Sequence, residues 1–369
     1  MKVLHICNDY RDNNLYNQLF KLLAEDIEQT VFVPFKNQLE IKSIENYKVI
    51  HKVCYKNSDR IFFNIKGRKI FKVLQNEVSL PEYDLIHAHT LFSNGIIALL
   101  TKKRYGTEYV ISVRNVDVDF FMKNFFYLRK SAIKILLNSK KIIFISPVLK
   151  KKFLTYIKEE NVRKEIEEKS LIISNGIDDF WLKNKFKENE FINELKVIQV
   201  GWIGNNKNQL NSVKAIELLN KRNIPCELNI IGGVANKKYY SNLLKYIENS
   251  HYKEKIQVME SKDKSELINL YRESNIYLMP SFSETFGLTY IEAMSQGLPI
   301  IYSENQGVDM LFDDAPVGMH VTPNCPEDIG EKIVLISENL EFYKDNIDCH
   351  LSKFTWQRVK TKLLKDVYN

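Results

Sequence analysis

Two glutamates, Glu284 and Glu292, are the residues of this sequence whose type and spacing best suit chemistry on a polar ligand. Glu292 falls about one turn into an apolar stretch, residues 288–296, that predicts a short helix. Its neighbours are mostly hydrophobic, so we expect its carboxylate to be largely buried and to need hydrogen-bond donors or a ligand. Sugar hydroxyls are good donors to an ionised carboxylate, and a pair of glutamates could hold the hydroxyls of two sugar rings. The free amides at the helix start, near Gly287 and Leu288, can bind a phosphate.

The elements on both sides of these glutamates predict a βαβ unit. Residues 276–279 form an apolar run that ends at Pro280, which predicts a buried parallel strand. Gly297 stands where a left-handed helix cap is needed, and Pro299 prevents the helix from continuing into the next strand, residues 299–302. Ligands of such sheets bind beyond the carboxyl ends of the strands. Both glutamates therefore fall at the expected ligand-binding edge.

Residues 282–301, FSETFGLTYIEAMSQGLPII, resemble the donor-binding motif of the retaining GT-B glycosyltransferases of family 4. The resemblance implies an α/β protein with two Rossmann-like, doubly wound domains that face each other across a cleft. It implies that Glu292 binds the nucleotide ribose and that Glu284 faces the donor sugar. It also places the backbone amides of Phe286, Gly287 and Leu288 near the sugar and the diphosphate.

A second stretch, residues 201–208 (GWIGNNKN), resembles the family pattern G-R-x-x-x-x-K-G/N, whose Arg and Lys clamp the donor diphosphate. Lys207 keeps its place, but Trp202 stands at the Arg position. An indole supplies stacking and one hydrogen-bond donor instead of a charge, which puts the two-cation clamp in doubt. Arg114 and Arg11 are conceivable substitutes. The family usually has a glycine after strand 255–259, where the backbone meets the nucleobase of the donor. This glycine is missing here, so the sequence does not identify that base.

In the N-terminal half, residues 85–88 predict a buried strand that leads to His89, in the order D-x-x-H-x-H that the family commonly shows. The resemblance implies that His89 lies near the reacting centre. From the residues alone, a hydrogen-bonded structural histidine is the stronger interpretation, and it is our expectation for His87. Residues 114–117 face the acceptor or a phosphate, or form a salt-bridged loop; both interpretations stay open. Residues 8–14 lack the glycine-rich loop of many family members. Two roles stay open for this segment: contact with the acceptor, or capping of the following helix.

The length of 369 residues and a hydrophobic content of 44% predict a globular chain of two domains. We expect an acceptor domain over residues 1–178, a nucleotide-sugar donor domain over 179–345, and a C-terminal helix, 346–369, that returns to the first domain. Residues 181–190 are expected to be a linker. The five cysteines are scattered without zinc spacing, which suits a reducing cytosol, and no apolar run approaches the ~18 residues of a membrane span.

The charge is uneven along the chain, because residues 1–180 carry 30 Lys and Arg against 21 Asp and Glu, a net +9. The remainder carries a net −2. Residues 120–158 contain ten Lys or Arg, no acidic residue and several aromatic residues. This composition is typical of a basic amphipathic helix on an anionic bilayer. Against that interpretation, residues 142–145 must form a core strand, and helices flanking a sheet are also often basic outside. Nucleic acid is disfavoured because no recognised binding motif accompanies the charge.

We therefore expect a cytoplasmic enzyme, at the inner face of the membrane if the basic segment docks there. It would move a sugar, with retention, from a nucleotide-sugar to a hydroxyl of a saccharide or lipid-linked acceptor, in surface polysaccharide or glycolipid synthesis. His89, Glu284 and Lys207 are the expected catalytic residues. We expect no metal and no cofactor beyond the nucleotide-sugar co-substrate. The alternatives are a nucleotide-sugar epimerase or sugar-phosphate synthase on the same fold, a non-catalytic nucleotide-sugar-binding module and, less favoured, a glycoside hydrolase.

Overall fold

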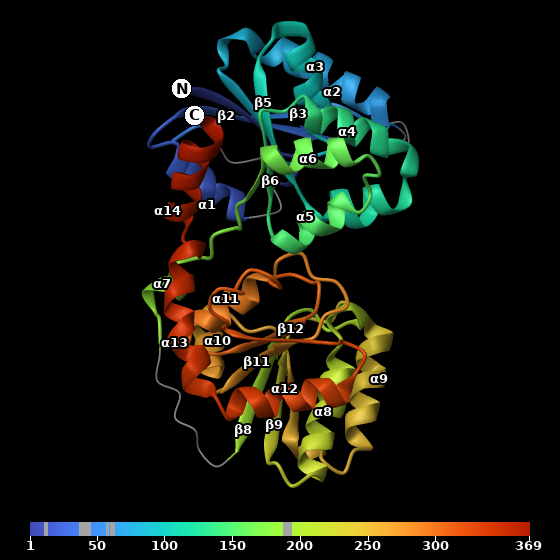
Figure 1. The fold of residues 1–369 in the computed structure, drawn as a ribbon, viewed down its shortest axis with the longest axis vertical. Helices are drawn as coiled ribbons and strands as arrows, with labels where there is room; N and C mark the ends of the chain where they lie inside the picture. The colour runs from blue at the N-terminus through green and yellow to red at the C-terminus, as the bar shows by residue number, and fades with distance from the viewer. Residues whose placement is uncertain (11–13, 37–45, 57–58, 60–62, 187–193) are drawn as a thin grey trace. The chain divides into compact units, whose positions relative to one another are not determined.

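The computed structural model describes residues 1–369 except 11–13, 37–45, 57–58, 60–62 and 187–193. The chain forms two compact units (Figure 1). The first contains Met1–Gly176 and Trp356–Asn369, and the second contains Ile177–Thr355. The segment that returns to the first unit thus begins at Trp356, and residues 346–355, which were expected in that segment, belong to the second unit. Within the described part of the chain, no helix combines the length and the apolar character needed to cross a bilayer.

The first unit is built on a parallel sheet of seven described strands in the order β3-β2-β1-β4-β5-β6-β7. The order reverses between β1 and β4, which pair directly, with His5 opposite His87. The five inner strands, β2, β1, β4, β5 and β6, are mostly buried on both faces, whereas the edge strands β3 and β7 are largely half-buried or exposed. Their bounds are β1 (Lys2–Ile6), β2 (Glu28–Phe35), β3 (Lys48–Val53), β4 (Leu85–Ala88), β5 (Glu108–Val113), β6 (Lys141–Phe144) and β7 (Ser170–Ile172).

The helices of the first unit are η1 (Asn8–Tyr10), α1 (Asn14–Leu23), α2 (Phe63–Glu77), η3 (Leu80–Glu82), α3 (Gly95–Tyr105), η4 (Val116–Met122), η5 (Phe126–Leu128), α4 (Arg129–Leu137), α5 (Pro147–Leu154), α6 (Glu160–Lys169), α14 (Trp356–Lys362) and η9 (Leu363–Tyr368). The C-terminal segment belongs to this unit because its apolar face completes the core: Val359, Leu363 and Val367 pack with α1 and the sheet. Trp356 lies against Gly176, where a Cβ would be 2.5 Å from the indole.

The second unit is built on a parallel sheet of six described strands in the order β10-β9-β8-β11-β12-β13. Its order reverses between β8 and β11. The strands are β8 (Leu195–Val200), β9 (Cys226–Ile231), β10 (Ile256–Met259), β11 (Ile276–Met279), β12 (Ile300–Ser303) and β13 (Gly318–Val321). A reversal of this kind leaves a crevice at the carboxyl ends of the two central strands, the usual ligand position of an open α/β sheet.

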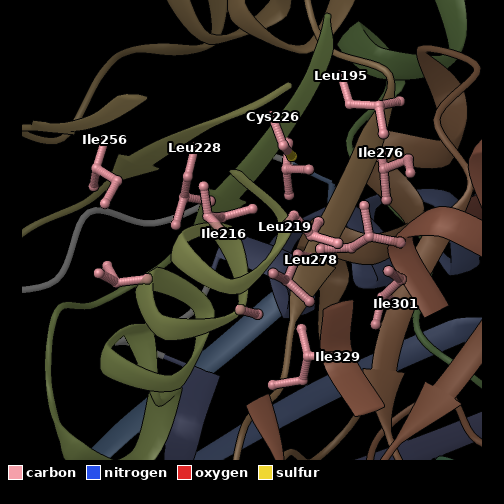
Figure 2. Packing of buried hydrophobic residues seen from close by; sticks show 14 of the residues in the cluster. Leu195, Ile216, Leu219, Cys226, Leu228, Ile256, Ile276, Leu278, Ile301 and Ile329 are labelled. Carbon is pink, nitrogen blue, oxygen red and sulfur yellow. The ribbon is translucent and has the colours of Figure 1, made fainter. Parts of the chain in front are cut away.

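The helices of the second unit are α7 (Asp179–Lys183), η6 (Asn205–Lys207), α8 (Gln209–Lys221), α9 (Lys237–Glu248), η7 (Lys253–Lys255), α10 (Lys264–Arg272), α11 (Leu288–Ser295), α12 (Pro326–Ser337), α13 (Leu340–Leu351) and η8 (Ser352–Phe354). One side of the core joins α8, α9 and α12 to the sheet. Figure 2 shows this cluster, with Ile216 and Leu219 of α8 and Ile329 of α12 packed on Leu228 and Leu278. The helices α10 and α11 cover other parts of the strands and position the candidate site.

The predicted strands 85–88 and 276–279 have the bounds that the sequence indicated, and the predicted strands 255–259 and 299–302 each begin one residue later in the structure, as β10 and β12. Gly297 adopts the predicted left-handed conformation, with a φ of 78°.

The basic segment, residues 120–158, is divided among η4, η5, α4, β6 and α5, so it does not form a single amphipathic helix. The core strand expected at residues 142–145 is β6, and its Ile142 and Ile143 are buried. The start of the expected linker 181–190 is ordered: Trp181 in α7 is buried against Tyr271 at a ring distance of 5.6 Å.

Candidate functional site

The candidate site lies at the carboxyl edge of the second unit's sheet, where the loops after β8 and β11 meet. The backbone N–H of Phe282 donates to the carbonyl of Asn206 at 2.8 Å, and Asn206 Nδ2 donates to the carbonyl of Ser283 at 2.8 Å. Asn208 adopts a left-handed conformation with a φ of 58°, and its Nδ2 donates to the carbonyl of Pro280 at 2.9 Å. The two loops are therefore fixed to each other at the point where the strand order reverses.

Lys207 and Glu284, both predicted site residues, form an ion pair across these loops. Their side chains are 19% and 12% exposed. The carbonyl of Lys207 accepts from Gln199 Nε2 at 2.7 Å, and the backbone N–H of Glu284 donates to Gln306 Oε1 at 3.2 Å. A charge pair with this little solvent contact is weakly screened. Each charge would therefore also interact strongly with a ligand: the ammonium with phosphates and the carboxylate with hydroxyls.

The loop that carries Glu284 is closed by glycines. Gly307 has a φ of 53°, and a Cβ there would lie 2.9 Å from Glu284 Cγ. Its N–H donates to the carbonyl of Glu284 at 3.1 Å. Gly287 has a φ of 82°, and a Cβ there would lie 2.4 Å from the ring of Tyr290. Only glycine suits these two positions, because each needs both a positive φ and the missing Cβ.

The helix α11 begins directly after Gly287, without a side chain that caps it. The amides of Leu288 and its successor are therefore open to an anion, in line with the predicted role of this helix start. Phe286 was predicted to contact the donor through its backbone. Its side chain is buried, with the ring 5.8 Å from that of Phe354, so only the backbone of Phe286 can bind a ligand.

Glu292, the second glutamate, is half-buried on α11. Burial raises the pKa of Glu292 to about 7, while the ammonium of Lys264 opposes that rise and the carboxylate of Asp178 adds to it. Lys264 itself pairs with Asp178 at 2.5 Å. Glu292 therefore holds a carboxylate that its surroundings compensate only in part, and hydroxyl donors of a ligand would stabilise its charged form.

Tyr277, which sequence reasoning did not single out, lies within electrostatic reach of both glutamates. It is fully buried, and its hydroxyl contacts Thr289 Oγ1 at 2.6 Å and the carbonyl of Val200 at 3.1 Å. Burial raises the pKa of Tyr277 well above its ordinary value, and the charges of Glu284 and Glu292 both raise it further. Its position on an apolar strand offered no signal of this role.

Trp181 and Lys264 were also missed as neighbours of Glu292. Trp181 was assigned to a linker, and Lys264 is a lysine at a helix start that no spacing rule connects to α11. The packing of α7 on α11 brings Trp181 to the carboxylate, and the fold brings the ammonium of Lys264, at the start of α10, within electrostatic reach of it.

In the first unit, His89 is buried, at 1% exposed, and does not present its ring to solvent. Its Nε2 lies 3.1 Å from Nδ1 of His5, and the rings of Tyr16 and Phe20 meet it edge-on. Burial lowers the pKa of His89 well below its ordinary value, so the imidazole is neutral. The role implied for His89 at the reacting centre stays a prediction.

His87 is structural in its contacts, as expected from the sequence. Its Nδ1 lies 2.8 Å from the hydroxyl of Tyr368 and its Nε2 lies 2.8 Å from Oγ of Ser112. His5, His87 and His89 are close enough together to be considered as metal ligands. However, both ring nitrogens of His87 are already engaged, and a neutral imidazole has one lone pair to give. We therefore assign no metal to this cluster.

The loop 114–117, for which two interpretations were open, is held by buried hydrogen bonds. Asp117 accepts from the backbone N–H groups of Leu91, Phe92 and Arg114 at 3.0, 3.2 and 2.9 Å. Burial raises the pKa of Asp117 to about 6, and these three donors oppose the rise. The guanidinium of Arg114 lies 5.7 Å from the ring of Tyr16, and its Nε donates to the carbonyl of His89 at 3.4 Å. Asp117 is thus structural, and Arg11 lies outside the described residues.

The fold described above agrees with the comparisons with known proteins. Residues 182–348 match the family model for glycosyl transferases group 1, and residues 15–179 match that for glycosyltransferase family 4. The chain belongs to the GT-B glycosyltransferases of family 4.

One relative is an uncharacterised glycosyltransferase of Methanocaldococcus jannaschii, 24% identical over 291 residues, which are 78% of this chain and 76% of the relative. Among solved structures, the lipopolysaccharide outer core galactosyltransferase WaaB, in its apo form, is similar with a TM-score of 0.75 and 15% identity, over 100% of this chain and 99% of that one. HepE of Anabaena, in complex with UDP and glucose, has a TM-score of 0.68 and 14% identity over 100% and 99%. These structures support the fold.

Proposed function

We propose that this glycosyltransferase transfers a sugar, with retention of the anomeric configuration and without a metal ion, from a nucleoside diphosphate sugar to an acceptor hydroxyl. The observation that carries the proposal is the ion pair of Lys207 and Glu284 at the strand reversal of the second sheet. In the resting protein the two charges satisfy each other. On donor binding, the ammonium turns to the diphosphate and the carboxylate accepts from sugar hydroxyls.

The chemical step needs a stabilised leaving diphosphate and an electron-poor sugar ring. Lys207 and the open amides at the start of α11 stabilise the negative charge that grows on the diphosphate as the glycosidic bond breaks. Glu284 orients the sugar, and Glu292 holds the ribose of the nucleotide. The nucleotide therefore departs from a site that is already arranged for its charge, which lowers the barrier more than it strengthens substrate binding.

The direct experiment is incubation of the purified chain with a panel of nucleotide-sugars and saccharide acceptors, with and without chelator. We expect release of nucleoside diphosphate and an acceptor product of unchanged anomeric configuration, both insensitive to the chelator. Binding of nucleotide-sugars without nucleotide release would instead indicate a non-catalytic module. Release of free sugar from simple glycosides would indicate a hydrolase, and an interconverted nucleotide-sugar would indicate an epimerase.

We also propose that the acceptor is a surface saccharide or a lipid-linked sugar. In addition, we propose that the first unit contacts the anionic inner face of the cell membrane. An aromatic patch supports this part: Phe120, Phe126 and Tyr127 are 49%, 75% and 58% exposed, and the aliphatic Val116 in the same η4 segment as Phe120 is 47% exposed. The rings form a chain of contacts through Phe125, at 5.4 Å from Phe120 and 5.9 Å from Tyr127.

The aromatic patch is flanked by positive charge. Lys123 and Lys130 are exposed beside it, and the η4 segment is tied to α5 by the ion pair of Asp119 and Lys152. Aromatic rings at the level of the lipid headgroups, with lysines beside them, are typical of peripheral docking on an anionic bilayer.

The membrane proposal is tested by co-sedimentation with phosphatidylglycerol-containing vesicles. We expect salt-sensitive binding that the double substitution Phe126→Ser and Tyr127→Ser abolishes. Phe342→Ser is the matched control, because Phe342 is 56% exposed on α13 of the second unit. Equal binding of all three proteins, or no binding at low salt, would contradict the proposal.

A further inference from the structure

The residue that departs most from the family pattern, Trp202, is also the most exposed large hydrophobic residue of the second unit among the described residues, at 65%. The other two tryptophans, Trp181 and Trp356, are 1% and 4% exposed. A single exposed apolar side chain needs no explanation by itself. Two features of this indole do need an explanation: the backbone that supports it, and its position at the edge of the sheet.

The indole is held by a backbone that only glycine allows. A Cβ on Gly233 would lie 2.6 Å from Cζ3 and 3.1 Å from Cε3 of Trp202, and 3.2 Å from Oγ of Ser261. A Cβ on Gly232 would lie 1.9 Å from the carbonyl oxygen of Gly201. The chain after β9 therefore approaches β8 so closely that one edge of the indole rests on Gly233, while most of the ring stays open to solvent.

Hydrogen bonds fix the loop of Trp202 in the same place. The backbone N–H of Ile203 donates to the carbonyl of Gly233 at 2.8 Å. Gln209 Nε2 donates to the carbonyl of Trp202 at 3.1 Å, and Gln209 Oε1 accepts from the N–H of Gly204 at 3.3 Å. An aromatic ring on a backbone that is ordered in advance loses little entropy when a planar ligand stacks on it.

The proposed phosphate cation, Lys207, and the indole of Trp202 belong to the same loop after β8. A Cβ on Gly201 would be 3.8 Å from Cε of Lys207, so the lysine stem passes over the residue that directly precedes Trp202. Gly201, Gly233 and Ser261 follow β8, β9 and β10, three neighbouring strands of the sheet. Going along the edge from β11 towards β10, the site therefore presents the Lys207–Glu284 pair and then an open aromatic face.

A nucleoside diphosphate has the matching order of groups, with an anionic diphosphate followed by a planar, aromatic base. We infer that Trp202 stacks on the base of the donor nucleotide. This stacking replaces part of the binding free energy that a second cation at the diphosphate would contribute. The inference rests on the proposed function. It predicts a protein that discriminates nucleotides from other diphosphates by their base.

The test compares UDP, GDP and ADP with inorganic pyrophosphate, which has no base, by calorimetry. For Trp202→Ala we expect nucleoside diphosphates to bind roughly tenfold more weakly, which is about 1.4 kcal/mol and typical of one base on one aromatic ring. Pyrophosphate should bind as in the wild type. Trp202→Phe keeps a stacking face and should recover most of the affinity. Phe342→Ala, at another exposed aromatic residue, should bind every probe as the wild type does.

Fluorescence gives a second readout. Since the other two tryptophans are buried, nucleotide binding should quench the wild-type emission through Trp202, and the quench should be clearly smaller in Trp202→Phe. Equal affinity of wild type and Trp202→Ala for nucleotides, or an equal loss for nucleotides and pyrophosphate, would overturn the stacking role while leaving the proposed function intact. If the wild type binds no nucleotide at all, the proposed function fails and the stacking role fails with it. Thermal unfolding of each variant shows that the fold is retained.

Discussion

The two sheets reverse their strand order in the same way, but their sequences fill the two reversal points with opposite chemistry. In the second unit, the loops after β8 and β11 place Lys207 against Glu284 with part of both side chains open to solvent. In the first unit, the reversal between β1 and β4 brings His5, His87 and His89 together, each at most 2% exposed. Burial lowers the pKa of all three histidines, so the cluster is uncharged.

The difference shows that a Rossmann-like sheet supplies a position and leaves the chemistry to its loops. Charged groups can remain at the edge of the second sheet because each has a partner and some solvent. At the first reversal, Tyr16, Phe20 and Tyr368 cover the imidazoles, and an imidazole without water or a carboxylate beside it gives up its proton. The first reversal is therefore a packed polar core, and the second is a partly solvent-accessible candidate site.

The largest expected effect is a difference in acid sensitivity between the two regions. The histidines have folded-state pKa values below the unfolded value of 6.5, that of His5 being about 3, so their contribution to stability is complete above pH 6.5 and falls as the pH is lowered towards the folded pKa. Between pH 7 and pH 5, we expect a loss of about 2 kcal/mol for each imidazole that stays neutral. Asp117, with its pKa raised to about 6, offsets about 1 kcal/mol of that loss.

In the second unit the sign is reversed for Glu292. Its pKa is raised to about 7, so the folded state holds a proton that the unfolded state releases, and this contribution grows as the pH falls from 7. Hydrogen exchange at pH 7 and pH 5, corrected for the intrinsic rates, should show β1 and β4 losing protection while α11 does not. Equal losses in both regions would remove the distinction between them.

The second prediction concerns the charged reversal itself. Lys207→Ala removes the cation that would face the diphosphate and should lower kcat/KM by roughly 100- to 1000-fold, as loss of one preorganised electrostatic group does in other active sites. Lys262→Ala is the matched control, because Lys262 pairs with the exposed Glu266 in the same unit and should cost almost nothing. Steady-state kinetics of both variants decide the matter. An unchanged kcat/KM in the Lys207→Ala variant would show that the ion pair has only a structural role.

The third prediction uses the titration of Glu292. Glu292→Gln keeps the shape of the side chain and removes its charge, so we expect UDP-glucose to bind about tenfold more weakly at pH 8, where the wild-type carboxylate is ionised. At pH 6 the wild-type carboxyl is protonated and the two proteins should differ little. UDP-glucose is the suitable ligand because its diphosphate does not titrate near neutral pH. Calorimetry at both pH values measures the effect, and a difference that does not depend on pH would contradict the ribose role.

The smallest effect separates backbone strain from collision at two glycines. Gly106 and Gly287 have φ values of 79° and 82°, but a Cβ on Gly106 would meet nothing within 4 Å, whereas one on Gly287 would lie 2.4 Å from Tyr290. We expect Gly106→Ala to lower the free energy of unfolding by about 1 kcal/mol through strain alone. Gly287→Ala should cost about 1 kcal/mol more, because the ring must also move. Denaturant titrations of both variants give the comparison.

Much of the site could be predicted from the sequence because its members are close together in the chain. The strand, loop and helix over residues 276–303 follow from apolar runs, a left-handed glycine and a proline, and they place Glu284 in the loop and Glu292 on the helix. Lys207 was predicted from the resemblance of one further loop, residues 201–208, to the family pattern. Tyr277, Trp181 and Lys264 were missed because each reaches the site through packing between elements that no short-range pattern records.

The sequence by itself determined the strands, the helix ends and which loops carry charge, because these depend on neighbours within a few residues. Only the tertiary structure decided the charge state and the accessibility of each group. It buried His89 among aromatic rings, paired Lys207 with Glu284, raised the pKa of Glu292 and left the indole of Trp202 open. The physical reason is that desolvation and pairing energies are set by atoms that are adjacent in space, and the fold brings those atoms from distant parts of the chain.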